Sequence, residues 1–421
     1  MAEPLSSALL SANATILDDD VLIAGVSLSA AAQQFGTPFF LYDEDDIRAR
    51  AQEAAAVFND GVAYASKAFL CGAMARLVVA EGLCLDVSTA GELDLALRAG
   101  VPGGRLILHG NNKSRDELQL AVDVGARRIV LDNEADIAHL ALSLGKGQRA
   151  DVMIRVTPGV EAHTHEFVQT GQEDSKFGFS LATGAAADAA RAVRKIPGVH
   201  LAGFHMHIGS QIFDLTPWSV AIAAIAPLVR EFDVEELCVG GGLGVAYVDG
   251  EEAPTISEWG AYVRGAAEGA GLSHVALTAE PGRSIVAPTA VTVYEVGTMK
   301  TAAQRRYIAV NGGMSDNPRP VLYGSGYEAF LLRDPRAPRD TSARIVGKHC
   351  ESGDVLIDEA WVPDDISVGD LLVTPVTGAY GISMASNYNR VPRPPVLFAR
   401  DGHVRAVQRR ETFDDLARLE V

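Results

Sequence analysis

Residues 62–109 read VAYASKAFLCGAMARLVVAEGLCLDVSTAGELDLALRAGVPGGRLILH, and this stretch decides the fold. Three short apolar runs, Val62–Ser66, Cys84–Val87 and Leu106–His109, are separated by segments rich in Ala, Leu, Glu and Arg. The runs have the length and composition of buried strands, and the segments between them are typical of amphipathic helices. This alternation predicts βαβ units with parallel strands.

The same alternation continues to about residue 285. Five further apolar runs are predicted strands: Arg128–Leu131, Val152–Val156, Ala202–His207, Glu236–Gly240 and Val275–Glu280. Eight strand–helix repeats predict an α/β protein with a closed (β/α)₈ barrel, which we assign to residues 37–285. The stretch GVEAHTHEFVQTGQEDSKFGFS (159–180) is long for a connection, and we expect it to be a functional loop.

The pattern changes after residue 286. Segments such as AVTVYEVGTMK (290–300) and DLLVTPV (370–376) are short, β-branched and punctuated by Gly, Pro and Asp. They predict a C-terminal antiparallel β-sheet domain over residues 286–421. The N-terminal segment, residues 1–36, is predicted to pack on that domain, and VLIAGVSL (21–28) or the following TPFFLYD is expected to add a strand to its sheet.

Composition excludes several classes of partner. The chain has 421 residues, 48% of them hydrophobic and 21% charged, which is typical of a globular protein with two domains. Its net charge of -18 argues against nucleic acid or an anionic membrane as a partner. Any bound phosphate must therefore be held locally, by backbone N–H groups and a few placed side chains.

The N-terminus and the cysteines favour a reducing cytoplasm. No Lys or Arg precedes the first apolar stretch, so a signal peptide is not expected, and no apolar run is long enough to span a bilayer. The four cysteines form no C-x-x-C pair, and Cys71, Cys84 and Cys238 lie in apolar surroundings that predict buried, reduced thiols.

Lys67 is the first residue that indicates chemistry. It follows the first predicted strand in YASKAFL, at the end of a barrel strand where active sites gather. A poorly solvated amine at this place would be a neutral nucleophile able to form a Schiff base. The alternative is a surface lysine that starts the next helix, and the motif alone does not separate the two.

Three more motifs follow the last three predicted barrel strands: HMHIGSQ (205–211), GGGLG (240–244) and EPGRS (280–284). An imidazole can stack on a flat ring, Ser210 can donate to a phosphate, and glycines let N–H groups approach an anion. Glu280 can pair with a ring nitrogen, and Arg283 matches a carboxylate. The structural alternatives are a buried histidine pair, a Gly-rich turn and an internal salt bridge.

The predicted sheet domain contains three further clusters. MSDNPRPVLYG (314–324) holds Arg319 and Tyr323, KHCESGD (348–354) holds Cys350 and Glu351, and TGAYGISMASNYN (377–389) holds Tyr380. Cys350 has polar neighbours, where a thiol can exchange a proton. Taken singly, each cluster is better explained as a loop than as a site.

The ordered set YASKAF, HGNNK, TGQEDSKFG, HMHIGSQ, GGGLG, EPGR, MSDNPRP, CESGD and TGAY carries a resemblance. Over roughly residues 35–400 the chain resembles the diaminopimelate decarboxylases, a family of fold-type-III pyridoxal-phosphate enzymes with an alanine racemase-like barrel. Nine motifs in this order are not expected by chance in one chain.

The resemblance implies a role for each candidate residue and a pyridoxal 5'-phosphate cofactor. It implies that Lys67 is the covalent link to the cofactor and that His207 stacks on the ring. Glu280 would lie at the ring nitrogen, with Pro281, Gly282 and Arg283 beside it. The residues implied around the phosphate are Ser210, Gly241, Gly242 and Tyr380. The substrate-binding residues implied are Arg283, Arg319, Tyr323, Glu351 and Tyr380. Lys67, His207 and the proton donor Cys350 would be catalytic. No metal is expected. The family forms homodimers in which CESGD enters the partner's site.

The function implied is decarboxylation of meso-2,6-diaminopimelate to L-lysine and CO₂, the last step of lysine biosynthesis. A decarboxylase of arginine, ornithine or a carboxylated polyamine such as carboxynorspermidine is the main alternative, and an acidic residue in place of Arg319 would have favoured a diamine product. An alanine racemase would have a catalytic tyrosine and no CESGD. A binding protein for pyridoxal-phosphate homeostasis would be a bare barrel without residues 286–421.

Overall fold

The structure, a computed structural model, describes residues 6–160 and 175–421, and these form two compact units. The barrel unit contains Arg50–Gly244 and Ala253–Ser284. The sheet unit contains the chain up to Ala49, together with Val245–Glu252 and Ile285–Val421.

Eight parallel strands form the barrel unit: β5 (Ala63–Ala65), β6 (Cys84–Val87), β7 (Leu106–Leu108), β8 (Arg128–Leu131), β9 (Ala150–Thr157), β11 (Val199–Met206), β12 (Glu236–Cys238) and β13 (Ala276–Thr278). Strands consecutive in this order are hydrogen-bonded, and the short β10 (Phe179–Ser180) pairs with β9. The N–H groups of Ala63 and Ala65 donate to the carbonyls of Ala279 and Pro281 at 2.9 and 3.2 Å, which joins β5 to the chain at the end of β13. The (β/α)₈ prediction is confirmed.

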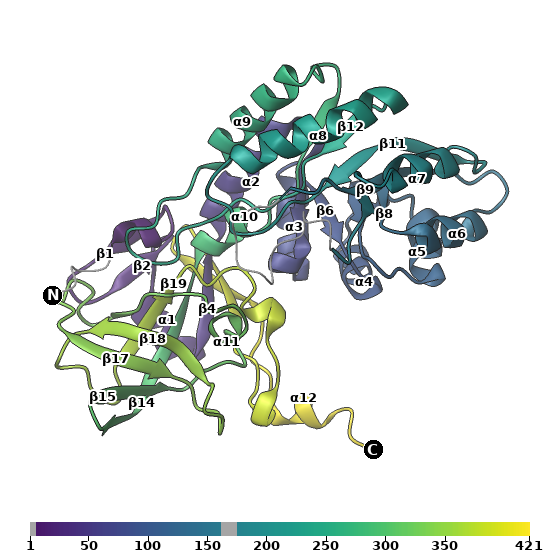
Figure 1. Ribbon diagram of the computed structural model, residues 1–421. Helices are drawn as coiled ribbons and strands as arrows, with labels where there is room; N and C mark the ends of the chain where they lie inside the picture. Colours follow the sequence, from purple (N-terminus) through teal and green to yellow (C-terminus); the bar gives the residue numbers. More distant parts are fainter. Residues whose placement is uncertain (1–5, 161–174) are drawn as a thin grey trace. The chain divides into compact units, whose positions relative to one another are not determined.

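Helices surround these strands (Figure 1): α2 (Glu44–Phe58), α3 (Gly72–Ala80), α4 (Ala90–Arg98), α5 (Arg115–Asp123), α6 (Glu134–Ser143), α7 (Ala185–Val193), α8 (Thr216–Phe232), α9 (Ile256–Gly269) and the short α10 (Arg283–Val286). Two of them begin at capping boxes, in which Ser114 and Thr255 exchange hydrogen bonds with the residues three positions on. These caps fix where the loops that follow β7 and β12 end.

An apolar layer fills the barrel, with one residue from each of six strands: Ala63, Cys84, Ile107, Val130, Met153 and Cys238. Such a layer is a packed core and leaves the chemistry to the carboxyl ends of the strands. Cys71, Cys84 and Cys238 are buried and Cys350 is exposed, and none of the four forms a disulfide in the described part of the chain. The prediction of three buried, reduced cysteines is confirmed.

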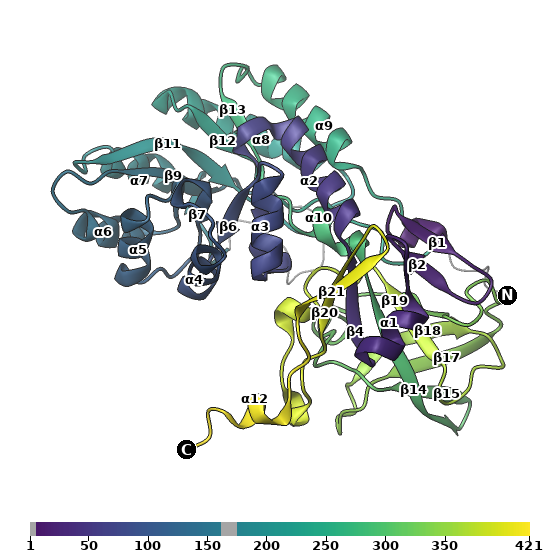
Figure 2. The same ribbon diagram turned by 180° about the vertical axis from the view of Figure 1, so that it is seen from behind.

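The sheet unit is built on one large sheet. Its strands and helices are β4 (Phe39–Asp43), β14 (Ala290–Ala302), β15 (Arg305–Val310), α11 (Arg319–Tyr323), β16 (Phe330–Leu331), β17 (Thr341–Val346), β18 (Val355–Val362), β19 (Leu371–Pro375), β20 (Val396–Arg400), β21 (His403–Gln408) and α12 (Phe413–Ala417). The strand order is β18-β17-β15-β14-β4-β20-β21, with β19 paired to β14 and β16 (Figures 1 and 2).

Two details of the predicted sheet domain are wrong. The sheet is mixed, because β15 pairs with β17 and β4 pairs with β20 in parallel. The segment 37–49, which we assigned to the barrel, lies in the sheet unit, because Phe39–Asp43 pairs with β14 and β20. All five residues of β4 are buried and four of them are apolar or aromatic. This short apolar run resembles a barrel strand, which explains the wrong assignment.

The chain before β4 forms a small sheet of its own. Strands β1 (Ala14–Ile16), β2 (Val21–Ile23) and β3 (Val26–Ser27) are antiparallel and lead into α1 (Leu28–Phe35). VLIAGVSL therefore contributes to this sheet, and TPFFLYD supplies the strand that joins the large one.

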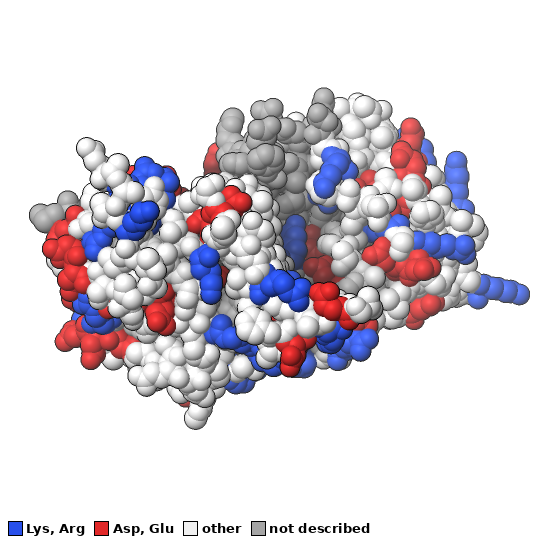
Figure 3. All heavy atoms as spheres, turned by 90° about the horizontal axis from the view of Figure 1, so that it is seen from below, with Lys and Arg blue, Asp and Glu red and all other residues white. Residues whose placement is uncertain are grey.

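The remaining predictions concern the surface and one loop. Among the described residues, no helix has the length and apolarity needed to cross a membrane. On the face drawn in Figure 3, acidic and basic side chains are interspersed. Most of the predicted functional loop 159–180 falls on residues 161–174, which lie outside the described residues.

Candidate active site

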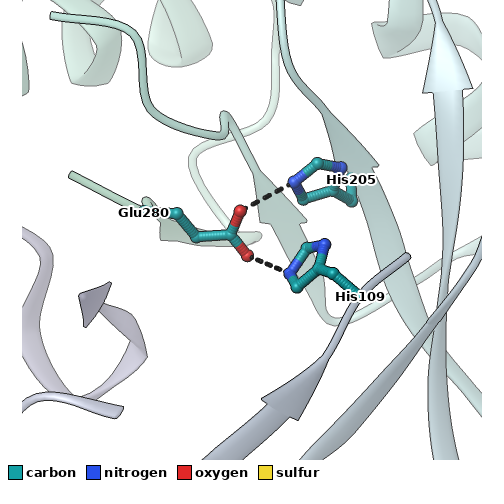
Figure 4. Close-up of side chains that lie close together, drawn as sticks. All are labelled: His109, His205 and Glu280. Atoms are coloured by element: carbon teal, nitrogen blue, oxygen red, sulfur yellow. Dashed lines mark hydrogen bonds and ion pairs between the residues drawn. The ribbon is translucent and has the colours of Figure 1, made fainter. Parts of the chain in front are cut away.

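Glu280 is the centre of a buried cluster at the carboxyl end of the barrel strands. It follows β13, and its two carboxylate oxygens lie 2.8 Å from His109 Nε2 and 2.9 Å from His205 Nε2 (Figure 4). His109 follows β7 and His205 lies in β11, with ring centroids 5.0 Å apart in an edge-to-face arrangement. Three strand ends therefore hold one carboxylate.

The charges of this cluster follow from burial and pairing. Burial alone would raise the pKa of Glu280, but attraction to His109 and the hydrogen bonds from His109 and His205 outweigh it and place the pKa well below its usual value. Burial lowers the pKa of His109, but attraction to Asp86 and Glu280 raises it overall. Burial dominates at His205 and lowers its pKa to about 4. Glu280 is therefore ionised, and His205 is a neutral donor at neutral pH.

Two imidazoles and a carboxylate are also ligand types for a metal ion, and the ligand atoms of His109, His205 and Glu280 lie within 4.8 Å of one another. In this arrangement both Nε2 atoms are turned onto the carboxylate at hydrogen-bonding distance (Figure 4). The two rings orient Glu280, and a carboxylate has about four lone-pair sites, so it can accept a further N–H from a ligand.

His207 presents a neutral imidazole next to the Gly-rich turn. Its Nδ1 accepts the N–H of Gly241 at 3.3 Å, which leaves the ring proton on Nε2. Burial, followed by the charge of Lys67, lowers the pKa of His207 well below its usual value. The ring is therefore uncharged and can stack on an aromatic ligand.

The predicted phosphate-binding loops pack closely on one another. A Cβ on Gly241 would lie 2.3 Å from the carbonyl oxygen of Glu280, and one on Gly242 would lie 2.3 Å from that of Gly209. Gly242 also has a φ of 111°, so only glycine suits this turn. The loops after β11, β12 and β13 thus meet at backbone distance, which suits N–H recognition of an anion.

Ser210 and Arg283 connect two of these loops. Arg283 Nη2 donates to Ser210 Oγ at 3.0 Å, and Arg283 is 9% exposed. Arg283 begins α10, directly after the Glu280–Pro281–Gly282 turn. A cation and a hydroxyl are therefore held together beside the Gly-rich turn.

Lys67 lies on the same end of the barrel. It occupies the single turn Ser66–Ala68 that follows β5, and a Cβ on Gly282 would lie 3.0 Å from the carbonyl oxygen of Ala65. Its side chain is exposed in the isolated chain, so the expectation of a desolvated amine is wrong for this state. The structure does bring Lys67 to the loops that carry His207 and Glu280.

The sheet unit holds the other candidate residues, and Arg319 is the most enclosed. It is 4% exposed and starts α11. Its Cζ lies 4.1 Å from the ring centroid of Tyr247 and 5.4 Å from that of Tyr327, and its Nη1 donates to the Tyr327 hydroxyl at 2.5 Å. Tyr323, at the other end of α11, is half-buried.

Cys350, Glu351 and Tyr380 lie at loop positions. Cys350 and Glu351 are exposed between β17 and β18, and the N–H of Cys350 donates to Asn389 Oδ1 at 3.2 Å. Tyr380 follows β19 with a φ of 59°, a left-handed conformation that is uncommon outside glycine and is often found at ligand sites. The side chain of Arg319 interacts electrostatically with Tyr380.

The barrel residues fit pyridoxal 5'-phosphate by their chemistry. An ionised, buried carboxylate suits a protonated pyridine nitrogen, a neutral imidazole suits the ring face, and the tightly packed glycine turns suit the phosphate. A primary amine at the end of β5 is the group that condenses with an aldehyde. The residues that would hold the cofactor are Lys67, His207, Ser210, Gly241, Gly242 and Glu280.

Asp86, Tyr247 and Tyr327 were not among the predicted residues. His109 and His205 lie in the quoted motifs HGNNK and HMHIGSQ, but neither was assigned a role of its own. Asp86 and His109 lie at the ends of the second and third strands, and His109 Nε2 is 3.7 Å from Asp86 Oδ1. Their signal was a polar residue at a barrel strand end, the same signal that identified Lys67. The tyrosines around Arg319 come from separate segments, and no local pattern marks them.

Known proteins share both units. Residues 44–287 match the family described as "Pyridoxal-dependent decarboxylase, pyridoxal binding domain". The diaminopimelate decarboxylase of Mycobacterium tuberculosis is 47% identical over 95% of both chains, and that of Bacillus subtilis is 42% identical over 95% of this chain and 94% of its own. The crystal structure of diaminopimelate decarboxylase from M. jannaschii with L-lysine covers 98% of both chains at 28% identity and a TM-score of 0.90.

Proposed function

This chain belongs to the pyridoxal-dependent decarboxylases, and from that premise we propose that it decarboxylates meso-2,6-diaminopimelate to L-lysine and CO₂. The observation that carries the proposal is the coverage of its relatives: proteins 42–47% identical over about 95% of the chain are named diaminopimelate decarboxylases. The likeness extends through the sheet unit, which holds Arg319, Tyr323 and Glu351.

When bound, pyridoxal phosphate supplies an electron sink for the carbanion that loss of CO₂ leaves. Glu280 holds a proton on the ring nitrogen, because its carboxylate is ionised and oriented by His109 and His205. His207 would contact the ring, and the turn at Gly241 and Gly242 with Ser210 would bind the phosphate. Lys67 would hold the cofactor through its amine.

The far end of diaminopimelate carries both a carboxylate and an ammonium group. Removing both charges from water is costly unless each is paired, which selects for a site with both signs. Arg319, with Tyr323 and Arg283, binds the carboxylate, and Glu351 binds the ammonium. Tyr247 and Tyr327 hold the Arg319 guanidinium in place and so reduce the entropy lost on binding.

The enzyme is proposed to act as a homodimer in the reducing cytoplasm. Cys350 and Glu351 are exposed on their own chain, which leaves them available to enter the site of a second copy. There Cys350 donates its proton to the α-carbon after CO₂ has left. Tyr380 completes the phosphate and substrate contacts.

A substrate panel tests the proposal. Purified protein loaded with pyridoxal phosphate should release CO₂ from meso-diaminopimelate and little from ornithine, lysine, arginine or carboxynorspermidine, because none of these pairs both charges of the site. Release from one of the others at a higher kcat/KM would assign the chain to that substrate. Cofactor binding without release from any of them would favour a binding protein.

Arg319→Ala should lose about 10- to 150-fold in kcat/KM toward diaminopimelate, since a charge-assisted hydrogen bond is worth ~1.5–3 kcal/mol. The visible absorbance of the bound cofactor should stay unchanged. Arg305→Ala, which removes an exposed arginine from β15 in the same unit, is the control and should behave as wild type. Unaltered kinetics in Arg319→Ala would rule out this role.

Cys350→Ala should retain the cofactor and turn over about 10²- to 10⁴-fold more slowly, the usual loss when a general acid is removed. Glu359→Gln, which changes an exposed residue of β18 in the same unit, should keep wild-type turnover. Rapid-mixing measurements in H₂O and D₂O would follow protonation of the α-carbon. Protonation as fast in the variant as in wild type would mean that another group is the acid.

A further inference from the structure

Two segments meet at one buried carboxylate, one leading to Arg319 and the other carrying Cys350 and Glu351. The first, residues 311–317, follows β15 and leads into α11, which begins at Arg319. The second, residues 347–354, connects β17 to β18 and carries Cys350. Asp354, which is 3% exposed, accepts the N–H of Met314 on Oδ1 at 2.6 Å and the N–H of His349 on Oδ2 at 2.8 Å.

Glycines on both sides let the backbone approach this carboxylate. A Cβ on Gly347 would lie 2.2 Å from Asp354 Oδ2, and one on Gly313 would lie 2.7 Å from Oδ1. The same Gly347 Cβ would lie 2.5 Å from the Cα of Gly313. No larger residue fits at either position without displacing Asp354, so the two glycines and the carboxylate form a single packed unit.

Two further contacts join the same segments. The N–H of Lys348 donates to the carbonyl of Gly312 at 2.9 Å. His349 Nε2 lies 2.8 Å from Ser315 Oγ, and the side chains of His349 and Ser315 are buried. These two contacts therefore join the segments 311–317 and 347–354 on either side of the Asp354 contact. The last residues of the junction are His349, one residue before Cys350, and Ser315, four residues before Arg319.

From this junction we propose that Asp354 is a positioning residue, which holds the Cys350–Glu351 loop in register with the segment that carries Arg319. The inference rests on the proposed function. In the proposed dimer Arg319 serves the site of its own chain and Cys350 that of the partner, so the junction links the substrate-binding side chain of one site to the acid of the other. Asp354 itself touches neither substrate nor cofactor.

Asp354→Asn tests the proposal, because it keeps the size of the side chain but turns one acceptor into a donor that faces a backbone N–H. Amide hydrogen exchange of Met314 and His349 should become about tenfold faster or more, since each reports local opening of its hydrogen bond. Turnover should fall about tenfold with an increased solvent isotope effect, as expected when a displaced acid makes proton transfer slower. Cofactor absorbance should stay as in wild type.

Asp334→Asn is the matched control, since it removes an exposed aspartate from the same unit, and it should change none of these quantities. Ser315→Ala, which removes only the bond to His349, is the milder variant and decides by the same criteria if Asp354→Asn does not fold. Faster exchange with unchanged turnover would overturn the proposal, as would slower turnover with unchanged exchange. The exchange measurement needs no substrate, so a wild-type protein that fails to decarboxylate diaminopimelate would contradict the proposed function alone.

Discussion

Replacing Lys67 by alanine should remove the covalent link to the cofactor and lower decarboxylation by about a thousandfold or more, as expected for loss of a group that acts at the reacting centre. Purified wild-type protein should be yellow, and borohydride should fix the cofactor to it and bleach the visible absorbance. Mass spectrometry of the reduced protein should then locate the added mass on the peptide that contains Lys67.

Lys195→Ala is the control, because Lys195 is also exposed in the barrel unit but lies before β11, away from the carboxyl ends of the strands. It should keep the colour, the labelled peptide and the turnover of wild type. A Lys67→Ala protein that borohydride still labels would transfer the role to another lysine. Lys113 is a poor substitute, because its amine is buried in an ion pair with Asp136 at 2.7 Å.

The barrel could be predicted from the sequence because its signal is local. Parallel strands buried on both faces appear as short apolar runs, and Cys84–Val87 and Arg128–Leu131 are strands with the predicted bounds. The partner of a strand is not a local property. Phe39–Asp43 has the composition of a barrel strand and yet pairs with β14 and β20, and the parallel pairs β15–β17 and β4–β20 leave no mark on the sequence.

The site residues, too, could be predicted only where a local sequence pattern marks them. Lys67 and the motifs HMHIGSQ and EPGRS stood out because each follows an apolar run, and the structure brings their loops together. The choice of His207 within its motif came from the resemblance. What orients Glu280 could not be predicted, since His109 and His205 come from strands far apart in sequence and meet only when the barrel closes. The two tyrosines that enclose Arg319 were missed for the same reason.

Mixing Lys67→Ala with Cys350→Ala should restore activity that neither variant has alone. Each homodimer carries a lesion in both of its sites. If equal amounts are unfolded together and refolded, roughly half of the dimers pair the two variants at random, and the two-fold symmetry of such a dimer makes its composite sites complementary. One site then contains both lesions and the other contains none, because Lys67 comes from one subunit and Cys350 from its partner. Roughly one site in four should be fully active.

Lys67→Ala mixed with Glu280→Gln is the matched control. Both residues belong to the barrel unit and serve the site of their own chain, so every site in a mixed dimer keeps one lesion and mixing should restore nothing. Subunit exchange is checked independently with two affinity tags. If Cys350 served its own subunit, the first mixture would behave like the control, with a lesion in every site. Recovery in the first mixture alone therefore requires that Cys350 crosses to the partner, and equal absence of recovery in both, with exchange verified, would refute the shared site.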